Sequence, residues 1–202
     1  MRTKGIILFS AFILAACDSP GDLLQRVADY EDACNRHDVD AVLSLYAKDA
    51  RLEFGPLGAI EGKDRIRGIH EYDRAIDTEL QFENCIVEYR TVTCRAVENN
   101  QWLVAAGLEP LMYSASIFTF NRQGQIETTI AQMSPESAQV LGQVMARFNA
   151  WARSNVAWEY SELFRPDGSF EYSYDSGGKI LDLLRQWRAD SGRADDLESP
   201  NK

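Results

Sequence analysis

The residues that could carry acid–base or nucleophilic chemistry in this sequence are few and far apart. The 202-residue chain has two histidines, His37 and His70. A nucleophilic triad would need His70 beside Ser114 or Ser116 and an acid, and the sequence spacing does not indicate such a group. No Cys-x-x-Cys or His-x-x-x-His pair and no glycine-rich phosphate loop is present. The sequence therefore predicts neither a metal site nor a cofactor.

Two charged or titratable residues are candidates for the wall of a pocket. His70 lies one helical turn after Ile66, on a helix that we expect to border the core. Glu83 shares strand parity with Cys85 and Val87, which we take as the inner face, so it could reach the mouth of a pocket. A solvated or structurally satisfied role is the alternative for both residues.

The amino-terminal stretch "MRTKGIILFSAFILAAC" is typical of an export signal, because a basic start precedes a short apolar run. Its last four residues, Leu-Ala-Ala-Cys17, resemble the lipobox of bacterial lipoproteins, in which the signal is cut before an acylated cysteine. We therefore predict a signal peptide over 1–16, a tether over 17–22 and lipid attachment at Cys17. The protein would be exported and anchored to a bacterial membrane, on its periplasmic or cell-surface side. The alternative is a plain signal peptide that precedes a cysteine.

The net charge of the chain argues against nucleic-acid binding. The formal charge is -10, and no cluster of lysine and arginine residues relieves the repulsion from a phosphate backbone. Small neutral or apolar partners fit this charge better.

Three cysteines follow Cys17, and two of them could pair. If "NCIVEYRTVTC" forms a hairpin with Tyr89 and Arg90 at its turn, Cys85 faces Cys94 in a non-hydrogen-bonded pair, with Cα atoms about 4.5 Å apart. This separation accepts a disulfide. Two free thiols packed side by side are the alternative. Cys34 stays free in both cases.

These residues are carried by alternating helical and strand patterns that predict an α+β fold. The expected elements are a helix from Ser19, a helix over 38–46, a strand over 51–54, a helix over 64–76, and long strands between 79 and 132. This order predicts a cone-shaped, curved antiparallel sheet packed on the N-terminal helices.

A mainly helical extension is expected over 134–190, followed by a disordered tail over 191–202. Shifted by 118 residues, "ARFNAW" and "YSELFRPDGSFEY" align with "ADYEDA" and "VLSLYAKDARLEF". The extension is then either a degenerate half-repeat of helix, helix, strand and helix, or a chance agreement of amphipathic patterns.

Residues 23–133 resemble the nuclear transport factor 2 superfamily, which includes SnoaL-like and ketosteroid-isomerase-like domains. The resemblance rests on Tyr30, "NRHDVD" at 35–40, "LYAKDA" at 45–50 and "FTFNRQGQI" at 118–126. It implies the cone-shaped fold predicted above, and this fold hosts many functions.

Matched to the ketosteroid isomerase pattern, Tyr30 falls on the tyrosine that donates to the oxyanion, Phe54 on the general base and Ser116 on the second donor, an acid. A phenyl ring cannot abstract a proton, and a serine hydroxyl donates a weaker hydrogen bond than a carboxylic acid. The resemblance therefore makes Phe54 a wall of the pocket and excludes isomerase chemistry of this kind unless another acid replaces the base.

Two functions remain open. The first is a membrane-anchored domain that binds a small hydrophobic ligand or a protein partner without catalysis, with a homodimer through the sheet as a further interaction. The second is a cyclase, dehydratase or epoxide-hydrolase type of enzyme acting on a small hydrophobic substrate. The expected pocket-lining residues are Tyr30, Phe54, His70, Glu83, Trp102, Ser114, Ser116 and Phe118. An acid or histidine within reach of Tyr30 would favour the enzyme, whereas a pocket plugged by aromatic rings would favour the binder.

Overall fold

The computed structural model describes residues 19–54, 58–165 and 169–197. The predicted signal peptide over 1–16 and the acylation site Cys17 lie outside these residues. Within them, no helix is both long enough and apolar enough to cross a lipid bilayer.

Two capped helices open the chain. Ser19 caps α1 (Pro20–Asn35), and Asp22 completes a reciprocal capping box with it. Asp38 accepts a hydrogen bond from the Ala41 amide and caps α2 (Val39–Leu45). Leu23, Val27 and Tyr30 lie one or two turns apart along α1 and are buried.

The strand β1 begins earlier than the sequence pattern predicts. It covers Tyr46–Glu53, so α2 ends at Leu45 and Tyr46 already has extended backbone angles. The fully buried Tyr46 pairs with Ile126 of the neighbouring strand, and this tertiary contact outweighs the local helical pattern. A short strand β2 (Ala59–Glu61) and the helix α3 (Lys63–Ala75) follow.

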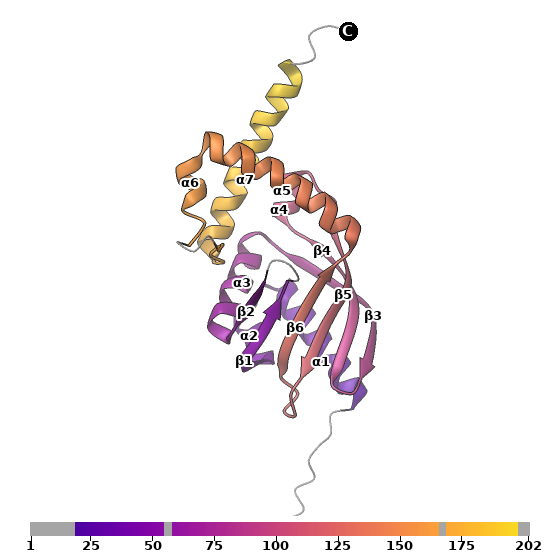
Figure 1. Ribbon diagram of the computed structural model, residues 1–202. Coiled ribbons are helices and arrows are strands. Elements are labelled where there is room, and N and C mark those ends of the chain that lie inside the picture. Colours follow the sequence, from indigo (N-terminus) through magenta and orange to yellow (C-terminus); the bar gives the residue numbers. More distant parts are fainter. Residues whose placement is uncertain (1–18, 55–57, 166–168, 198–202) are drawn as a thin grey trace, which may run out of the picture.

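The long strands form one curved, six-stranded sheet with β1 and β2 (Figure 1). They are β3 (Glu79–Glu88), β4 (Thr91–Asn99), β5 (Leu111–Phe120) and β6 (Ile126–Met133), and the strand order is β2-β1-β6-β5-β4-β3. The predicted antiparallel pairing holds except between β1 and β6, which run parallel, so the sheet is mixed. A core of buried side chains lies between this sheet and helices α1 to α3.

The β3–β4 hairpin has the predicted register at its turn. Val87 faces Val92 and Glu88 faces Thr91, while Cys85 and Cys94 form a disulfide with Cα atoms 4.1 Å apart. Beyond the disulfide the register shifts between Glu83 and Ile86, and Asn84 has a positive φ of 54°. This bulge reverses the strand parity of the residues that precede it.

The C-terminal helices form a second core at one end of the sheet (Figure 1). They are α5 (Pro135–Asn155), α6 (Ala157–Ser161) and α7 (Tyr174–Leu197), and they share this core with α4 (Gln101–Ala106), which packs against α7. Helix α7 continues to Leu197, so the predicted end of the extension at residue 190 is too early. The half-repeat hypothesis expects a strand between the second and third of these helices, and at that place an isolated bridge joins Phe164 and Phe170.

Candidate functional site

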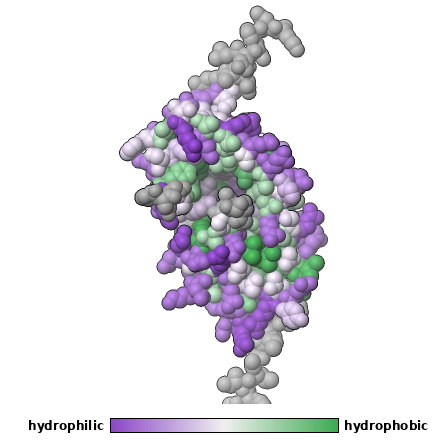
Figure 2. All heavy atoms as spheres, viewed as in Figure 1, coloured by the Kyte–Doolittle hydropathy of each residue, from purple (hydrophilic) through white to green (hydrophobic). Residues whose placement is uncertain are grey.

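A cavity of about 180 Å³ lies inside the cone, between the concave face of the sheet, helix α3 and the C-terminal extension. Tyr30 reaches it from α1, Phe54 from the end of β1 and Tyr172 from the segment before α7. The molecular surface in Figure 2 is hollowed below α5, with apolar side chains around the hollow. The extension is therefore part of the wall and not a separate appendage.

Much of the cavity wall is aromatic. The rings of Tyr30 and Phe82 each lie 5.3 Å from the ring of Phe118, in edge-to-face contact. The Tyr46 hydroxyl donates a long hydrogen bond, 3.4 Å, to the Tyr30 hydroxyl. Burial raises the pKa of Tyr30 well above its ordinary value, so its hydroxyl stays protonated.

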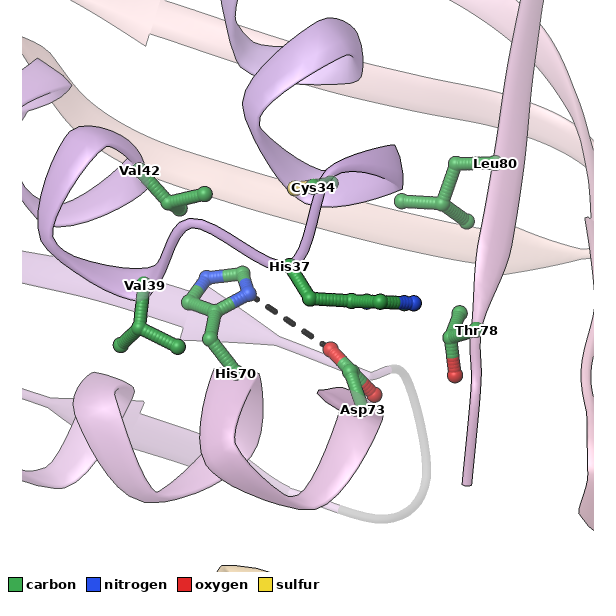
Figure 3. A pocket seen from close by; sticks show the side chains of 8 residues that line it. All are labelled: Cys34, His37, Val39, Val42, His70, Asp73, Thr78 and Leu80. Carbon is green, nitrogen blue, oxygen red and sulfur yellow. Dashed lines mark ion pairs between the residues drawn. The ribbon is translucent and has the colours of Figure 1, made fainter. Parts of the chain in front are cut away.

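A histidine–carboxylate pair on α3 borders the same cavity. His70 Nδ1 lies 3.5 Å from an Asp73 carboxylate oxygen, and the His70 side chain is 5% exposed. Figure 3 shows this pair, with Thr78 and Leu80 facing it across a small second pocket of about 10 Å³. Within the described chain, neither His70 Nε2 nor Thr78 Oγ1 has a hydrogen-bond partner. Two buried polar atoms are thus open to a water molecule or a ligand.

A half-buried acid on β4, Glu98, also lines the cavity. The Tyr113 hydroxyl donates a 2.6 Å hydrogen bond to Glu98 Oε2, and Asn100 Nδ2 donates one of 2.8 Å to Oε1. Burial, helped by the charge of Asp73, raises the pKa of Glu98 to about 7, although both hydrogen bonds oppose that rise. Glu98 can therefore exchange a proton near neutral pH.

Tyr72 and Tyr172 lie beside these carboxyls. Their rings are 5.3 Å apart in edge-to-face contact, and both side chains line the cavity. Burial raises the pKa of Tyr172, and the negative charges of Asp73 and Glu98 raise it further. We call Tyr72, Asp73, Glu98, Tyr113 and Tyr172 the acidic end of the cavity.

The structure brings five of the predicted pocket residues together. Tyr30, Phe54, His70, Ser116 and Phe118 all line the cavity. Phe54 forms part of the wall. The resemblance predicted this role for Phe54, which falls on the general-base position of the ketosteroid isomerase pattern.

Three other predicted lining residues lie elsewhere. The bulge at Asn84 turns Glu83 outward, where it is exposed and accepts a hydrogen bond from Gln81. A second irregularity, between Tyr113 and Ala115, turns Ser114 outward. Trp102 is buried in the second core, on α4.

Sequence reasoning missed the acidic end. Glu98 shares strand parity with Cys94 and Ala96, which are buried, so alternation along β4 is a signal that could have found it. Asp73 follows His70 by three residues on the same helix. No local pattern indicates Tyr172, because its approach to the cavity depends on how the extension packs.

The acidic end does not amount to a metal site. Among residues 19–54, 58–165 and 169–197, no group of three histidine, cysteine or carboxylate side chains could hold a metal ion.

Comparison with known proteins agrees with this architecture. The sequence profile of the SnoaL-like domain matches residues 27–128. Among solved structures, the epoxide hydrolase/cyclase-like enzyme SalBIII, from pyran ring formation in the polyether salinomycin, aligns with a TM-score of 0.52 and 15% identity, over 58% of this chain and 94% of its own. A cystatin-like protein of unknown function from Methylobium petroleophilum PM1 aligns with a TM-score of 0.51 and 16% identity, over 59% of this chain and 81% of its own. At these identities the likeness shows the fold alone. No curated protein matches the chain.

Proposed function

The chain belongs to the SnoaL-like domain family, and we propose that its cone binds a small, mainly apolar molecule without converting it. The observation that carries this proposal is the cavity itself. Its volume of about 180 Å³ suits a small organic molecule, and its wall combines aromatic rings with a few polar groups. Neither Phe54 nor Phe118 fills it.

The composition of the wall supports binding over isomerisation. Phe54 has no proton-accepting atom, and Ser116 offers only a hydroxyl. The Tyr30 hydroxyl is in hydrogen-bond contact with Tyr46, and no acid or histidine is hydrogen-bonded to it in the described chain. The His70 ring contacts the Tyr30 ring at 6.0 Å between centroids, which is a packing contact.

The test of binding is native mass spectrometry of the purified protein, together with extraction of any molecule that it carries. Ala131→Phe would place a ring inside the cavity, while Ala138→Phe would place the same ring on the exposed side of α5. We expect a carried molecule in the wild type and in Ala138→Phe, and its loss in Ala131→Phe. An empty wild-type protein, together with failure of small apolar probes to bind, would contradict the proposal.

Acid–base conversion of the bound molecule is a second candidate, and Glu98 is the observation that favours it. A carboxyl with a pKa of about 7 in an aromatic cavity is suited to donate or accept a proton. The carried molecule would be incubated with wild-type protein and with Glu98→Gln, and analysed by chromatography and mass. A new product that only the wild type forms would replace the binding proposal with an enzymatic one.

We also propose that the mature protein is exported and held at a membrane by lipid on Cys17. The proposal rests on the basic start, the apolar run and the Leu-Ala-Ala-Cys17 junction. Cys17→Ala should move the protein from the detergent phase to the aqueous phase, whereas Ser10→Ala, inside the apolar run, should not. If Cys17→Ala stays in the detergent phase, the anchor is elsewhere.

The domain division is part of the same proposal. We place the binding domain at 23–133 and treat 134–197 as its helical extension, because Tyr172 completes the wall of the cavity. A homodimer through the sheet stays a prediction, to be tested by the mass of the protein in solution.

A further inference from the structure

Acidic side chains outnumber basic ones among the described residues that line the cavity. Asp73 and Glu98 contribute two carboxyls, and among the described residues His70 is the one basic side chain of the lining. Within the described part of the chain, no lysine or arginine lines the cavity. A carboxylate or phosphate ligand would therefore add a negative charge beside two acids, with no fixed cation to balance them.

Hydrogen-bonding groups near the two carboxyls also have unused capacity. An ionised Glu98 offers about four acceptor sites, and Tyr113 and Asn100 occupy one on each oxygen. His70 Nδ1 faces the Asp73 carboxylate at 3.5 Å. The other ring nitrogen, Nε2, and the Thr78 hydroxyl are buried and have no hydrogen-bond partner in the described chain. The free acceptor sites of the carboxylates, together with these two unpartnered groups, can therefore receive a ligand that brings several donors.

Aromatic rings complete the surroundings of the two carboxyls. Tyr72, Tyr113 and Tyr172 line the cavity next to Asp73 and Glu98. Ring faces attract cations, most strongly where water is excluded. An ammonium group supplies a positive charge to balance the carboxyls and three donors for their free acceptor sites.

From these observations we propose that the ligand is a small apolar molecule carrying a protonated amine, with the ammonium group held between Asp73 and Glu98. The inference rests on the proposed binding function and names the chemical class of its ligand. The apolar body of the ligand packs against Tyr30, Phe82 and Phe118.

The proposal also predicts that Glu98 releases a proton when the amine binds. The pKa of Glu98 is about 7, so in slightly acidic solution the carboxyl is largely neutral. An ammonium ion favours the ionised form, so binding at about pH 6.5 should release a proton from Glu98 to the buffer. A neutral ligand of the same shape should release none.

The experiment compares three probes with one skeleton: 2-phenylethylamine, 2-phenylethanol and 3-phenylpropanoate. Isothermal titration of the full-length protein at about pH 8 should give an amine affinity at least about tenfold above that of the alcohol, since charge-assisted hydrogen bonds contribute about 1.5–3 kcal/mol. The carboxylate should not bind measurably. Titration at about pH 6.5 in two buffers of different ionisation heat should reveal proton release with the amine alone.

Glu98→Gln should lower the amine affinity to that of the alcohol. Glu83→Gln is the matched control, because Glu83 lies on an adjacent strand and points outward. Suppose that the alcohol binds, that Ala131→Phe abolishes this binding, and that the amine binds no more tightly than the alcohol. This result would overturn the amine inference and leave the binding function standing. Failure of all three probes, with an empty cavity by mass spectrometry, would overturn both.

Discussion

The carbonyl oxygen of Tyr172 occupies the space that a side chain on Gly68 would need. A Cβ atom at Gly68 would lie 2.5 Å from this oxygen, which is closer than real Cβ contacts come. Gly177, on α7, similarly leaves room for Ala75 of α3. The two glycines allow the extension to pack against α3, and this packing places the Tyr172 side chain at the cavity.

Gly68→Ala should therefore destabilise the protein, although alanine is the better helix former. The new methyl group meets backbone that cannot rotate away, and overpacking of this kind costs about 1–3 kcal/mol. The free energy of unfolding in urea measures the loss. Gly142→Ala, on α5, is the control, because nothing lies within 4 Å of its Cβ position. It should stabilise the protein by about 0.5–1 kcal/mol, and equal effects of the two changes would contradict the close approach of Tyr172 to α3.

The disulfide between Cys85 and Cys94 should stabilise the β3–β4 hairpin and the sheet edge. The two cysteines are 9 residues apart in sequence, so the bond closes a short loop in the unfolded chain and contributes about 2–3 kcal/mol. Protein exported with its own signal should have an unfolding midpoint that reductant lowers. Cys85→Ala/Cys94→Ala should start at the lower midpoint and not respond to reductant. A thiol assay on denatured, unreduced protein that labels both residues would show that the bond does not form.

Replacing Phe54 by aspartate should place a carboxyl in the cavity wall without a cationic partner. Desolvation should raise the pKa of this carboxyl and destabilise the fold by roughly a few kcal/mol at neutral pH. Phe54→Leu keeps the side chain apolar and should cost less. Comparison of the two melting temperatures tests the position of Phe54, and an unchanged melting temperature for Phe54→Asp would mean that Phe54 faces bulk solvent.

Stability should decrease as the pH rises from about 4.5 to about 7, because of Glu98. Its pKa rises from 4.5 to about 7 on folding, so within this window the native state holds a proton that the unfolded state has lost. The contribution lost across the window is about 1 to 3 kcal/mol. Urea unfolding at several pH values should show this slope in the wild type and a flatter one in Glu98→Gln. Equal slopes in the two proteins would show that Glu98 ionises normally.

Local patterns in the sequence were sufficient to predict most helices and strands. Ser19 and Ser134 cap helices where the sequence predicts helix starts, because a serine hydroxyl satisfies a free amide in the first turn wherever the helix packs. The pairing of Val87 with Val92 follows from a turn of fixed length. In each case neighbouring residues alone supply the interaction that defines the structure.

The alternation of inward and outward side chains along the strands gave wrong predictions for two site residues, Glu83 and Ser114. One extra residue at Asn84 moves Glu83 from the predicted inner face to the outer one, and a similar irregularity moves Ser114. A bulge depends on how two strands fit together over a curved core. The alternation of a single strand does not contain that information.

The sequence by itself determined the order of most elements and the hairpin register, because each depends on residues close together in the chain. Only the tertiary structure decided which polar groups share the cavity. Asp73 comes from α3, Glu98 from β4 and Tyr172 from the segment before α7. That these three residues line one cavity depends on the curvature of the sheet and on the close approach of the backbones of α3 and Tyr172 at Gly68. Contacts between residues so distant in the chain follow from the packing of whole elements, and no local pattern specifies them.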